Sequence, residues 1–142
     1  MVEQAKLKRD LVGKPVDHTD YRSMIGSLMY VTSSRPDIMF ATCMCARYHA
    51  NPNEHHVSAV KRIFGYLKGT INLVLWYLKD FGFNLTAYSV ADHARGHLDR
   101  KGTSGSVQFL GDKLVCWSSK KQNCVSISTA ESEYVAVSGC CA

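Results

Sequence analysis

The chain has 142 residues, of which 46% are hydrophobic and 20% are charged. This is the length of one domain with enough apolar material for a packed core. No apolar run reaches the roughly 18 to 20 residues that a membrane-spanning helix requires, so we expect no membrane span. Residues 1–20 are polar and lack the apolar stretch of a conventional export signal.

Charge and cysteine content narrow the function only slightly. The formal net charge is +5, but the basic residues are scattered, so weak nucleic-acid binding is left open rather than indicated. The six cysteines match neither a small disulfide scaffold nor the close pairs of a zinc knuckle. We interpret them as reduced, buried thiols, with metal or disulfide roles as the alternatives.

The first half of the chain predicts helices. Apolar residues recur at helical spacing over residues 24–29. Ser34, Pro36 and Asp37 then supply the start signal of a second helix, whose apolar residues continue to Tyr48. The apolar faces of both helices are expected to form a core.

A third helix has the clearest boundary signals. Asn51 is predicted as its N-cap, Pro52 as its first residue and Glu54 as the third residue of a capping arrangement. Gly69 stands where a left-handed terminating residue is expected, so the helix should end near Lys68. The stripe that this helix turns to the core comprises Val57, Val60, Phe64 and Leu67.

The second half predicts strands and a final helix. Runs of β-branched and aromatic residues at 71–77, 85–90, 106–110 and 113–117 have strand length. Gly111-Asp112 predicts a two-residue type II′ hairpin between the last two strands. Ser128 to Glu131 form a capping box that opens a helix to about Ser138. We therefore expect an α+β chain with a polar segment at 1–20, a helical segment at 21–70 and a sheet with one helix at 71–142.

Four short motifs in the second half identify a family resemblance. They are Tyr-Ser-Val-Ala-Asp at 88–92, Asp-Arg-Lys-Gly-Thr-Ser-Gly at 99–105, Trp-Ser-Ser-Lys-Lys-Gln at 117–122 and Ser-Thr-Ala-Glu-Ser-Glu-Tyr at 128–134. Together they resemble the ribonuclease H region of copia-type retrotransposon Pol polyproteins. Residues 21–30 and the Ser-Arg-Pro-Asp of 34–37 resemble the end of the reverse transcriptase part of the same polyproteins. The resemblance implies a truncated ribonuclease H-like sheet in residues 71–142.

The resemblance also implies where catalytic metal would bind. Ribonuclease H enzymes hold two magnesium ions with a cluster of carboxylates. The family motif Tyr-Ser-Asp-x-Asp-Trp places the first aspartate at the position of Val90, whose isopropyl group cannot bind a hard cation. The helical glutamate of the family matches Glu133, while Glu131 is better explained by the capping box. The third and fourth family carboxylates follow this helix, and the chain stops at Ala142.

Asp92 is the one residue that could replace the lost ligand. It lies two residues after Val90, so both side chains point to the same face of an extended strand. Asp92 and Glu133 would still make only two carboxylates, too few for a two-metal site. We therefore expect no catalytic residue, no metal, no cofactor and no enzymatic activity, with Asp92 and Glu133 as vestigial positions.

The histidine pairs of the sequence give weaker signals. His93 and His97 have a spacing of four residues, which makes a metal pair on a helix, but they lie in a loop that contains glycine. We predict that they are surface residues. His55-His56 begins the third helix, and we predict that both are exposed to solvent.

Two classes of function follow. A three-stranded sheet leaves one edge open, so a partner strand or the upstream helices are expected to cover it. The chain type also resembles oomycete secreted RxLR-type effectors, although neither an Arg-x-Leu-Arg tetrad nor a leader peptide is present. That resemblance implies binding to an unknown host protein in the cytoplasm or nucleus of a plant cell, and suppression of host cell death. The alternative is an intracellular retrotransposon ribonuclease H that cleaves RNA in RNA–DNA hybrids, or an inert relic of one.

Overall fold

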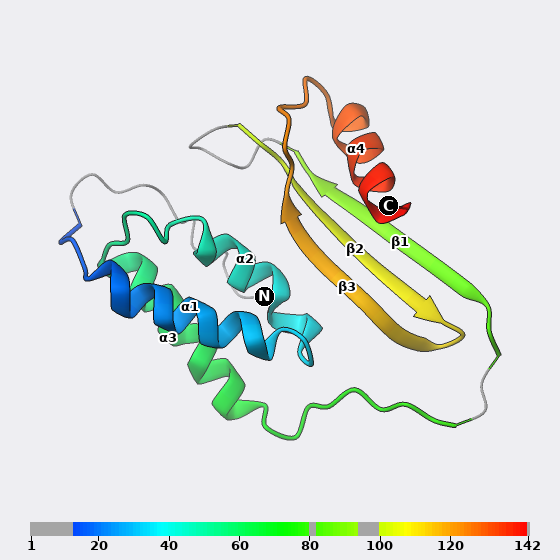
Figure 1. Ribbon diagram of the computed structural model, residues 1–142, viewed down its shortest axis with the longest axis horizontal. Coiled ribbons are helices and arrows are strands. Elements are labelled where there is room, and N and C mark those ends of the chain that lie inside the picture. Colours follow the sequence, from blue (N-terminus) through cyan, green and yellow to red (C-terminus); the bar gives the residue numbers. More distant parts are fainter. Residues whose placement is uncertain (1–12, 80–81, 94–99, 142) are drawn as a thin grey trace.

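The structure is a computed structural model that describes residues 13–79, 82–93 and 100–141. Three helices form the first part of the chain, and an extended connection leads from them to a three-stranded antiparallel sheet followed by a last helix (Figure 1). The α+β prediction is confirmed. Within the described residues no helix is both long and apolar enough to cross a membrane.

Helix α1 spans His18–Val31 and begins at a side-chain cap. Asp17 is its N-cap, and a carboxylate oxygen accepts a hydrogen bond of 2.7 Å from the backbone N–H of Thr19. This bond holds the pKa of Asp17 below its ordinary value. Three residues of α1 are buried at spacings of four and three, which is one face of a helix: Tyr21, Ile25 and Leu28.

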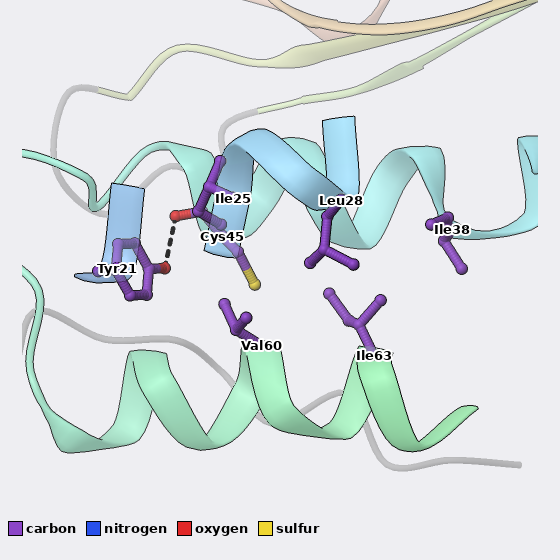
Figure 2. Close-up of a cluster of buried hydrophobic side chains, with 7 residues drawn as sticks. All are labelled: Tyr21, Ile25, Leu28, Ile38, Cys45, Val60 and Ile63. Carbon is purple, nitrogen blue, oxygen red and sulfur yellow. Dashed lines mark hydrogen bonds between the residues drawn. The ribbon is translucent and has the colours of Figure 1, made fainter. Parts of the chain in front are cut away.

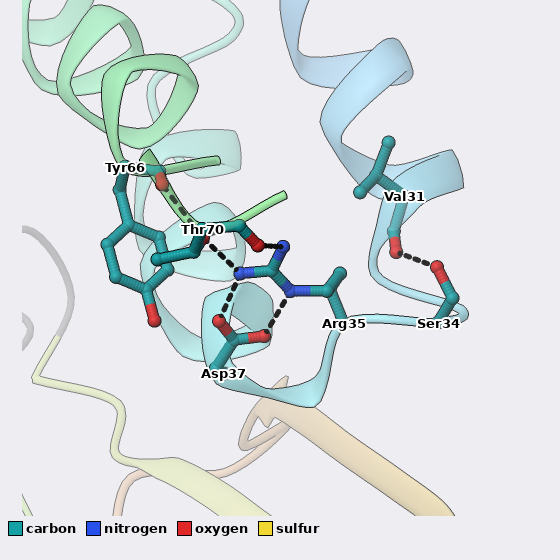
Figure 3. Close-up of polar contacts among 6 residues, drawn as sticks. All are labelled: Val31, Ser34, Arg35, Asp37, Tyr66 and Thr70. Atoms are coloured by element: carbon teal, nitrogen blue, oxygen red, sulfur yellow. Dashed lines mark hydrogen bonds and ion pairs between the residues drawn. The ribbon is translucent and has the colours of Figure 1, made fainter. Parts of the chain in front are cut away.

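The second predicted helix is divided into two short elements. A 3₁₀ turn, η1, spans Pro36–Ile38, and α2 spans Met39–Ala46. Arg35, directly before η1, donates to both carboxylate oxygens of Asp37 at 2.9 and 2.7 Å (Figure 3). The same guanidinium donates to the carbonyl and hydroxyl oxygens of Thr70 at 3.1 and 2.7 Å. Arg35 therefore joins the start of α2 to the end of the third helix.

Helix α3 spans Glu54–Gly69, and its cap differs from the prediction. The N-cap is Asn53, not Asn51: its side chain accepts from the backbone N–H of His56 at 3.1 Å. The ring Nδ1 of His56 in turn accepts from the backbone N–H of Asn53 at 3.0 Å. An imidazole thus takes the part that glutamate usually has in a capping box, and the expected exposure of His56 is wrong, because its side chain is buried against Tyr48.

The other end of α3 also corrects the prediction. Gly69 is the last helical residue and does not have the left-handed conformation expected of it. Thr70 ends the helix instead, and its hydroxyl donates to the carbonyl of Tyr66 at 2.8 Å. Ile63 is buried in place of Phe64, so the helix is rotated slightly from the predicted stripe.

The three helices share one hydrophobic core. Figure 2 shows the core side chains of α1, η1 and α2 on one side and those of α3 facing them from the other. The hydroxyl of Tyr21 reaches the carbonyl of Cys45 with a hydrogen bond of 2.8 Å, so this phenol is buried without losing its partner. The cluster comprises Tyr21, Ile25, Leu28, Ile38, Cys45, Val60 and Ile63.

The predicted strand at residues 71–77 is wrong. This segment makes a turn and then runs on without pairing to another strand within the described residues. Its large apolar side chains stay exposed, including Val74 and Trp76. Strand propensity reflects fit to neighbouring strands more than an intrinsic backbone preference, and none of the described strands pairs with this segment. The hydroxyl of Tyr77 donates a hydrogen bond to the carbonyl of Leu114 at 2.7 Å.

The sheet has the order β1-β2-β3, with strands Leu85–Asp92, Thr103–Leu110 and Lys113–Lys121. All pairs are antiparallel, and each strand is longer than predicted. The predicted hairpin is confirmed: Leu110 pairs with Lys113 across a two-residue turn, in which Gly111 alone has a positive φ, of 59°. A side chain at this glycine would also collide with the backbone of Gly82.

Helix α4 spans Thr129–Cys141 and lies over β1 and β2. Gln108 donates to the carbonyl of Cys140, at 3.2 Å, so the even-numbered residues of β2 face α4. The odd-numbered residues face the helices of the first part, because Thr103 accepts a short hydrogen bond from Arg47. The two halves of the chain therefore pack on opposite faces of one sheet, with α2 against β3 (Figure 1).

Candidate functional site

The position expected for the first metal ligand lies near the end of β1. Val90 pairs with Gly105 of β2, and its Cγ1 would lie 3.1 Å from a Cβ built on that glycine. The valine side chain therefore leans over Gly105, on the face opposite α4. It is 66% exposed. At this position the protein presents two methyl groups to solvent, where the family motif has an aspartate.

Asp92 lies on the same face as Val90, as predicted from their spacing. It pairs with Thr103, whose hydroxyl accepts from Arg47 of the helical part. The backbone around Asp92 is tightly packed, because a Cβ at Gly102 would approach its carbonyl oxygen to 2.9 Å. Asp92 is half-buried. Asp92 is thus paired across the strands with the residue that Arg47, directly after α2, contacts.

Glu133 lies elsewhere. It belongs to the first turns of α4 and is exposed. Because α4 covers the face of the sheet opposite to Val90 and Asp92, the fold does not gather these three positions on one face. Within the described residues no group of three or more His, Cys, Asp or Glu side chains is placed to hold a metal ion. Asp92 and Glu133 do not form the ligand set of a two-metal site.

Glu131 has the capping role expected from the sequence, with a shifted partner. Its backbone N–H donates to the hydroxyl of Ser128 at 3.2 Å, which is half of a capping box. Its carboxylate accepts from the backbone N–H of Ile127 at 2.7 Å, one residue before the expected donor. The side chain is thus engaged in starting α4.

A buried glutamine organises this end of the sheet, and the sequence reasoning did not find it. Gln122 follows β3 and is only 4% exposed. Its amide nitrogen donates to the hydroxyl of Ser104 at 3.0 Å and to the carbonyl of Ser132 at 2.8 Å. Its amide oxygen accepts from the hydroxyls of Ser126 and Ser132, at 3.3 and 3.2 Å. The motifs at 117–122 and 128–134 therefore meet through one side chain that joins α4 to the sheet.

The remaining candidates are dispersed. His93 is half-buried beside the end of β1, whereas His97 lies outside the described residues. Of the cysteines, Cys45 is buried and Cys43 and Cys140 are half-buried. Cys116 and Cys124 are exposed, so the expectation of buried thiols is wrong for these two.

The sheet has two edge strands, β1 and β3. The upstream helices lie against β3 and do not cover β1, and no strand of the described residues pairs with its outer side. The expectation that the upstream helices cover this edge is therefore wrong for β1. The other expectation, that a partner strand covers it, stays a prediction.

Similar proteins identify the origin of the chain. It is 41% identical over 124 residues to the retrovirus-related Pol polyprotein from transposon RE1 of Arabidopsis thaliana, and 37% identical over 137 residues to that from transposon RE2. It is also 35% identical over 119 residues to the secreted RxLR effector protein 161 of Plasmopara viticola, an alignment that spans 83% of the chain and 84% of that protein. The chain belongs to the copia-type Pol family.

This Pol-family chain corresponds to a small part of the long polyproteins. The two alignments cover 87% and 96% of the chain but only 8% and 9% of the polyproteins from RE1 and RE2. The effector of Plasmopara viticola, by contrast, matches it over most of both lengths. No known family profile matches the Pol-family chain. No solved structure matches it either.

Proposed function

We propose that the chain is a catalytically inactive, ribonuclease H-like protein that acts by binding. Val90 carries the proposal, because it stands at the first metal-ligand position of the family motif with its side chain exposed. Two-metal hydrolysis needs several carboxylate oxygens converging on two cations about 3.5 to 4 Å apart. A valine supplies none, and Asp92 lies on the face of the sheet opposite to α4, the helix that carries Glu133.

A nuclease assay tests the loss of catalysis. Purified protein is incubated with a labelled RNA–DNA hybrid in Mg²⁺ and in Mn²⁺, beside its Glu133→Ala variant. We expect no hybrid-specific cleavage by either protein. Hybrid cleavage by the natural chain that disappears in Glu133→Ala would overturn the proposal. Magnesium titration followed by NMR adds a direct readout, for which we expect no shift at Asp92 or Glu133 below millimolar metal.

The effector role rests on the relative from Plasmopara viticola, whose name states that it is secreted and an RxLR effector. By extension, this chain binds a host protein in the cytoplasm or nucleus of a plant cell and suppresses defence-associated cell death. The exposed apolar side chains of β1 and of residues 71–78 offer surface for such binding.

Expression in leaves challenged with a cell-death elicitor tests this role. Reduced necrosis is expected with the natural chain. The matched control is Leu28→Asp, which places a charge in the core and should remove the effect along with the fold. Undiminished necrosis with a natural chain that accumulates to detectable levels would count against the effector role.

The second candidate is a ribonuclease H part of a retrotransposon, active or inert, and the identity to the Pol polyproteins from RE1 and RE2 favours it. The nuclease assay separates an active enzyme from both other cases. An inert relic differs from an effector in the leaf assay, where it leaves necrosis unchanged.

A further inference from the structure

The start of α3 is closed by a buried imidazole. The ring Nδ1 of His56 accepts from the backbone N–H of Asn53 at 3.0 Å, and the Asn53 side chain accepts from the backbone N–H of His56 at 3.1 Å. His56 is only 2% exposed, and its ring stacks on that of Tyr48 with centroids 4.0 Å apart. The cap of α3 and its packing against the turn after α2 therefore depend on the same ring.

The hydrogen bond to Nδ1 requires one protonation state of His56. A ring nitrogen that accepts a hydrogen bond carries no proton, so the proton of the neutral ring is on Nε2. An imidazolium carries a proton on both nitrogens and can only donate. Protonation would turn Nδ1 from an acceptor into a donor that faces the N–H of Asn53, and the capping box could not stay closed.

The first turn of α3 disfavours a positive charge at His56. The unpaired N–H groups of a helix N-terminus carry a partial positive charge, which repels a cation. Glu54 is the acidic residue of this turn, but residues two apart on a helix do not face each other. His55 is exposed. Burial has the same effect as the helix terminus, because loss of water penalises the charged form of the ring.

The elements around this turn bring neutral groups and cations toward the ring. Burial raises the pKa of the Tyr48 phenol above its ordinary value, so the stacked partner is uncharged. The buried Tyr21 and Cys45 interact with this phenol and are uncharged for the same reason. Two cations stand on either side: Arg47 directly before Tyr48, and Lys14 in the segment bridged to the cap.

The same cap holds the segment before α1. Pro15 forms an isolated antiparallel bridge with Asn53, and the backbone N–H of Val16 donates to the carbonyl of Pro52 at 3.4 Å. Gly13 lies so close to Asn53 that a Cβ built on it would be 3.1 Å from that side chain. Residues 13–16 therefore pack on the cap residue of α3, and opening the cap would remove their contact surface.

We propose that His56 is a proton-controlled latch: protonation in mildly acidic solution opens the capping box of α3 and releases residues 13–16 from Asn53. At neutral pH the uncharged ring keeps the box closed. Histidine side chains in water take up a proton near pH 6.5. Because the open form binds this proton and the closed form does not, the closed form is fully stable above that pH and loses stability as pH falls below it.

Urea unfolding between about pH 7.5 and 5.5 tests the latch. His56→Gln keeps the capping box at every pH, because a glutamine oxygen accepts the same N–H without titrating. His55→Gln is the matched control, since it removes the exposed neighbour and leaves the latch intact. Relative to His56→Gln, the unfolding constants of the natural chain and of His55→Gln should rise by up to about tenfold per pH unit below about 6.5. An equal pH dependence in the natural chain and His56→Gln would overturn the proposal.

Nuclear magnetic resonance of the natural chain keeps the test decisive if His56→Gln does not fold. At neutral pH the ring carbons of His56 should report the uncharged form with its proton on Nε2. As pH falls, hydrogen-exchange protection should be lost together at the amides of Val16, Asn53 and His56, while that of Ile63 in the helical core persists. A ring that titrates while the first three amides stay protected would contradict the latch. A simultaneous loss at Ile63 would contradict it too, because the opening is local.

Discussion

The side chain of Arg35 connects the start of the second helical segment to the end of α3. Its guanidinium engages Asp37 with two hydrogen bonds and Thr70 with two more, and it lies 5.7 Å from the ring centroid of Tyr66 (Figure 3). The bidentate geometry suits arginine and not lysine, because only the planar guanidinium presents two parallel donors to a carboxylate. The Ser-Arg-Pro-Asp motif is thus a structural clamp in this fold.

This clamp predicts a pH-dependent stability. The pKa of Asp37 lies below its ordinary 3.8. The main cause is the hydrogen bonding from Arg35, and the hydroxyl of Tyr66 adds to it. A lowered pKa in the folded state means that the stabilisation is complete above the ordinary carboxyl pKa and is lost as pH falls through the lowered one. Asp37→Asn should therefore lower the unfolding midpoint by several degrees at neutral pH and make no difference in strong acid.

Thermal melts across a pH series, followed by circular dichroism, measure the difference between the natural chain and Asp37→Asn. Asp112→Asn serves as a control, since Asp112 is exposed in the hairpin turn. A difference between the natural chain and Asp37→Asn that stays constant from neutral to acid pH would contradict the ion-pair explanation.

Leu28 and Met29 are neighbours in α1, but their side chains have opposite environments. Leu28 is fully buried in the helical core, whereas Met29 is 59% exposed. Leu28→Ala should cost about 2 to 5 kcal/mol of unfolding free energy, through lost burial and the cavity left behind. Met29→Ala should stay within about 0.5 kcal/mol. Urea titration of both variants measures their free energies of unfolding. Equal losses would contradict the assignment of Leu28 to the core.

At the scale of elements, the signals that depend on local chemistry predicted the structure well. Helical periodicity located α1 to α3, and the Gly111-Asp112 pair located the hairpin, because backbone conformation there is set by the residues themselves. The N-cap of α3 was missed because a buried imidazole at His56 replaced the expected glutamate. Residues 71–77 have the composition of a strand, yet strand formation needs a neighbour that no local pattern reveals.

Helix α4 depends on Gln122 for its position on the sheet. The amide makes four hydrogen bonds in a buried place, and the groups it serves lie on β2, on α4 and in the loop between β3 and α4. Gln122→Ala should cost about 2 to 4 kcal/mol, because buried partners lose their hydrogen bonds and a cavity remains. Gln108→Ala, which removes one hydrogen bond to the other end of α4, should cost less.

Hydrogen exchange locates the effect of these two variants. In Gln122→Ala we expect protection to fall most in α4 and at the end of β3, while the amides of α1 and α3 keep most of theirs. A uniform loss of protection over the whole chain would mean that Gln122 stabilises the entire fold and not only the packing of α4 on the sheet.

For the whole molecule, the sequence resemblance located the candidate site, but only the sheet register described its geometry. The motif at 88–92 predicted that Asp92 shares the face of Val90, and the register confirms this. That Val90 replaces a metal ligand stays a prediction. That Glu133 belongs to the opposite face follows from which side of the sheet α4 covers, a tertiary choice that no local pattern contains. The Gln122 network likewise joins two motifs whose contact depends on the closed fold.

One polar contact between the two halves of the chain can be removed by a single substitution. The indole Nε1 of Trp117 on β3 donates to the carbonyl of Thr32 at the end of α1, at 2.8 Å. Trp117→Phe removes that donor and part of the ring, which leaves a carbonyl without its partner between helices and sheet. We expect a loss of about 1 to 3 kcal/mol and, because the contact lies between the halves, broader unfolding in which helices and sheet melt at separate temperatures. Unfolding of the natural chain and of the variant is followed by near-ultraviolet circular dichroism, far-ultraviolet circular dichroism and calorimetry, and the transition temperatures are compared. Coincident transitions in the variant would mean that apolar packing between α2 and β3 alone is enough to make the chain one cooperative unit.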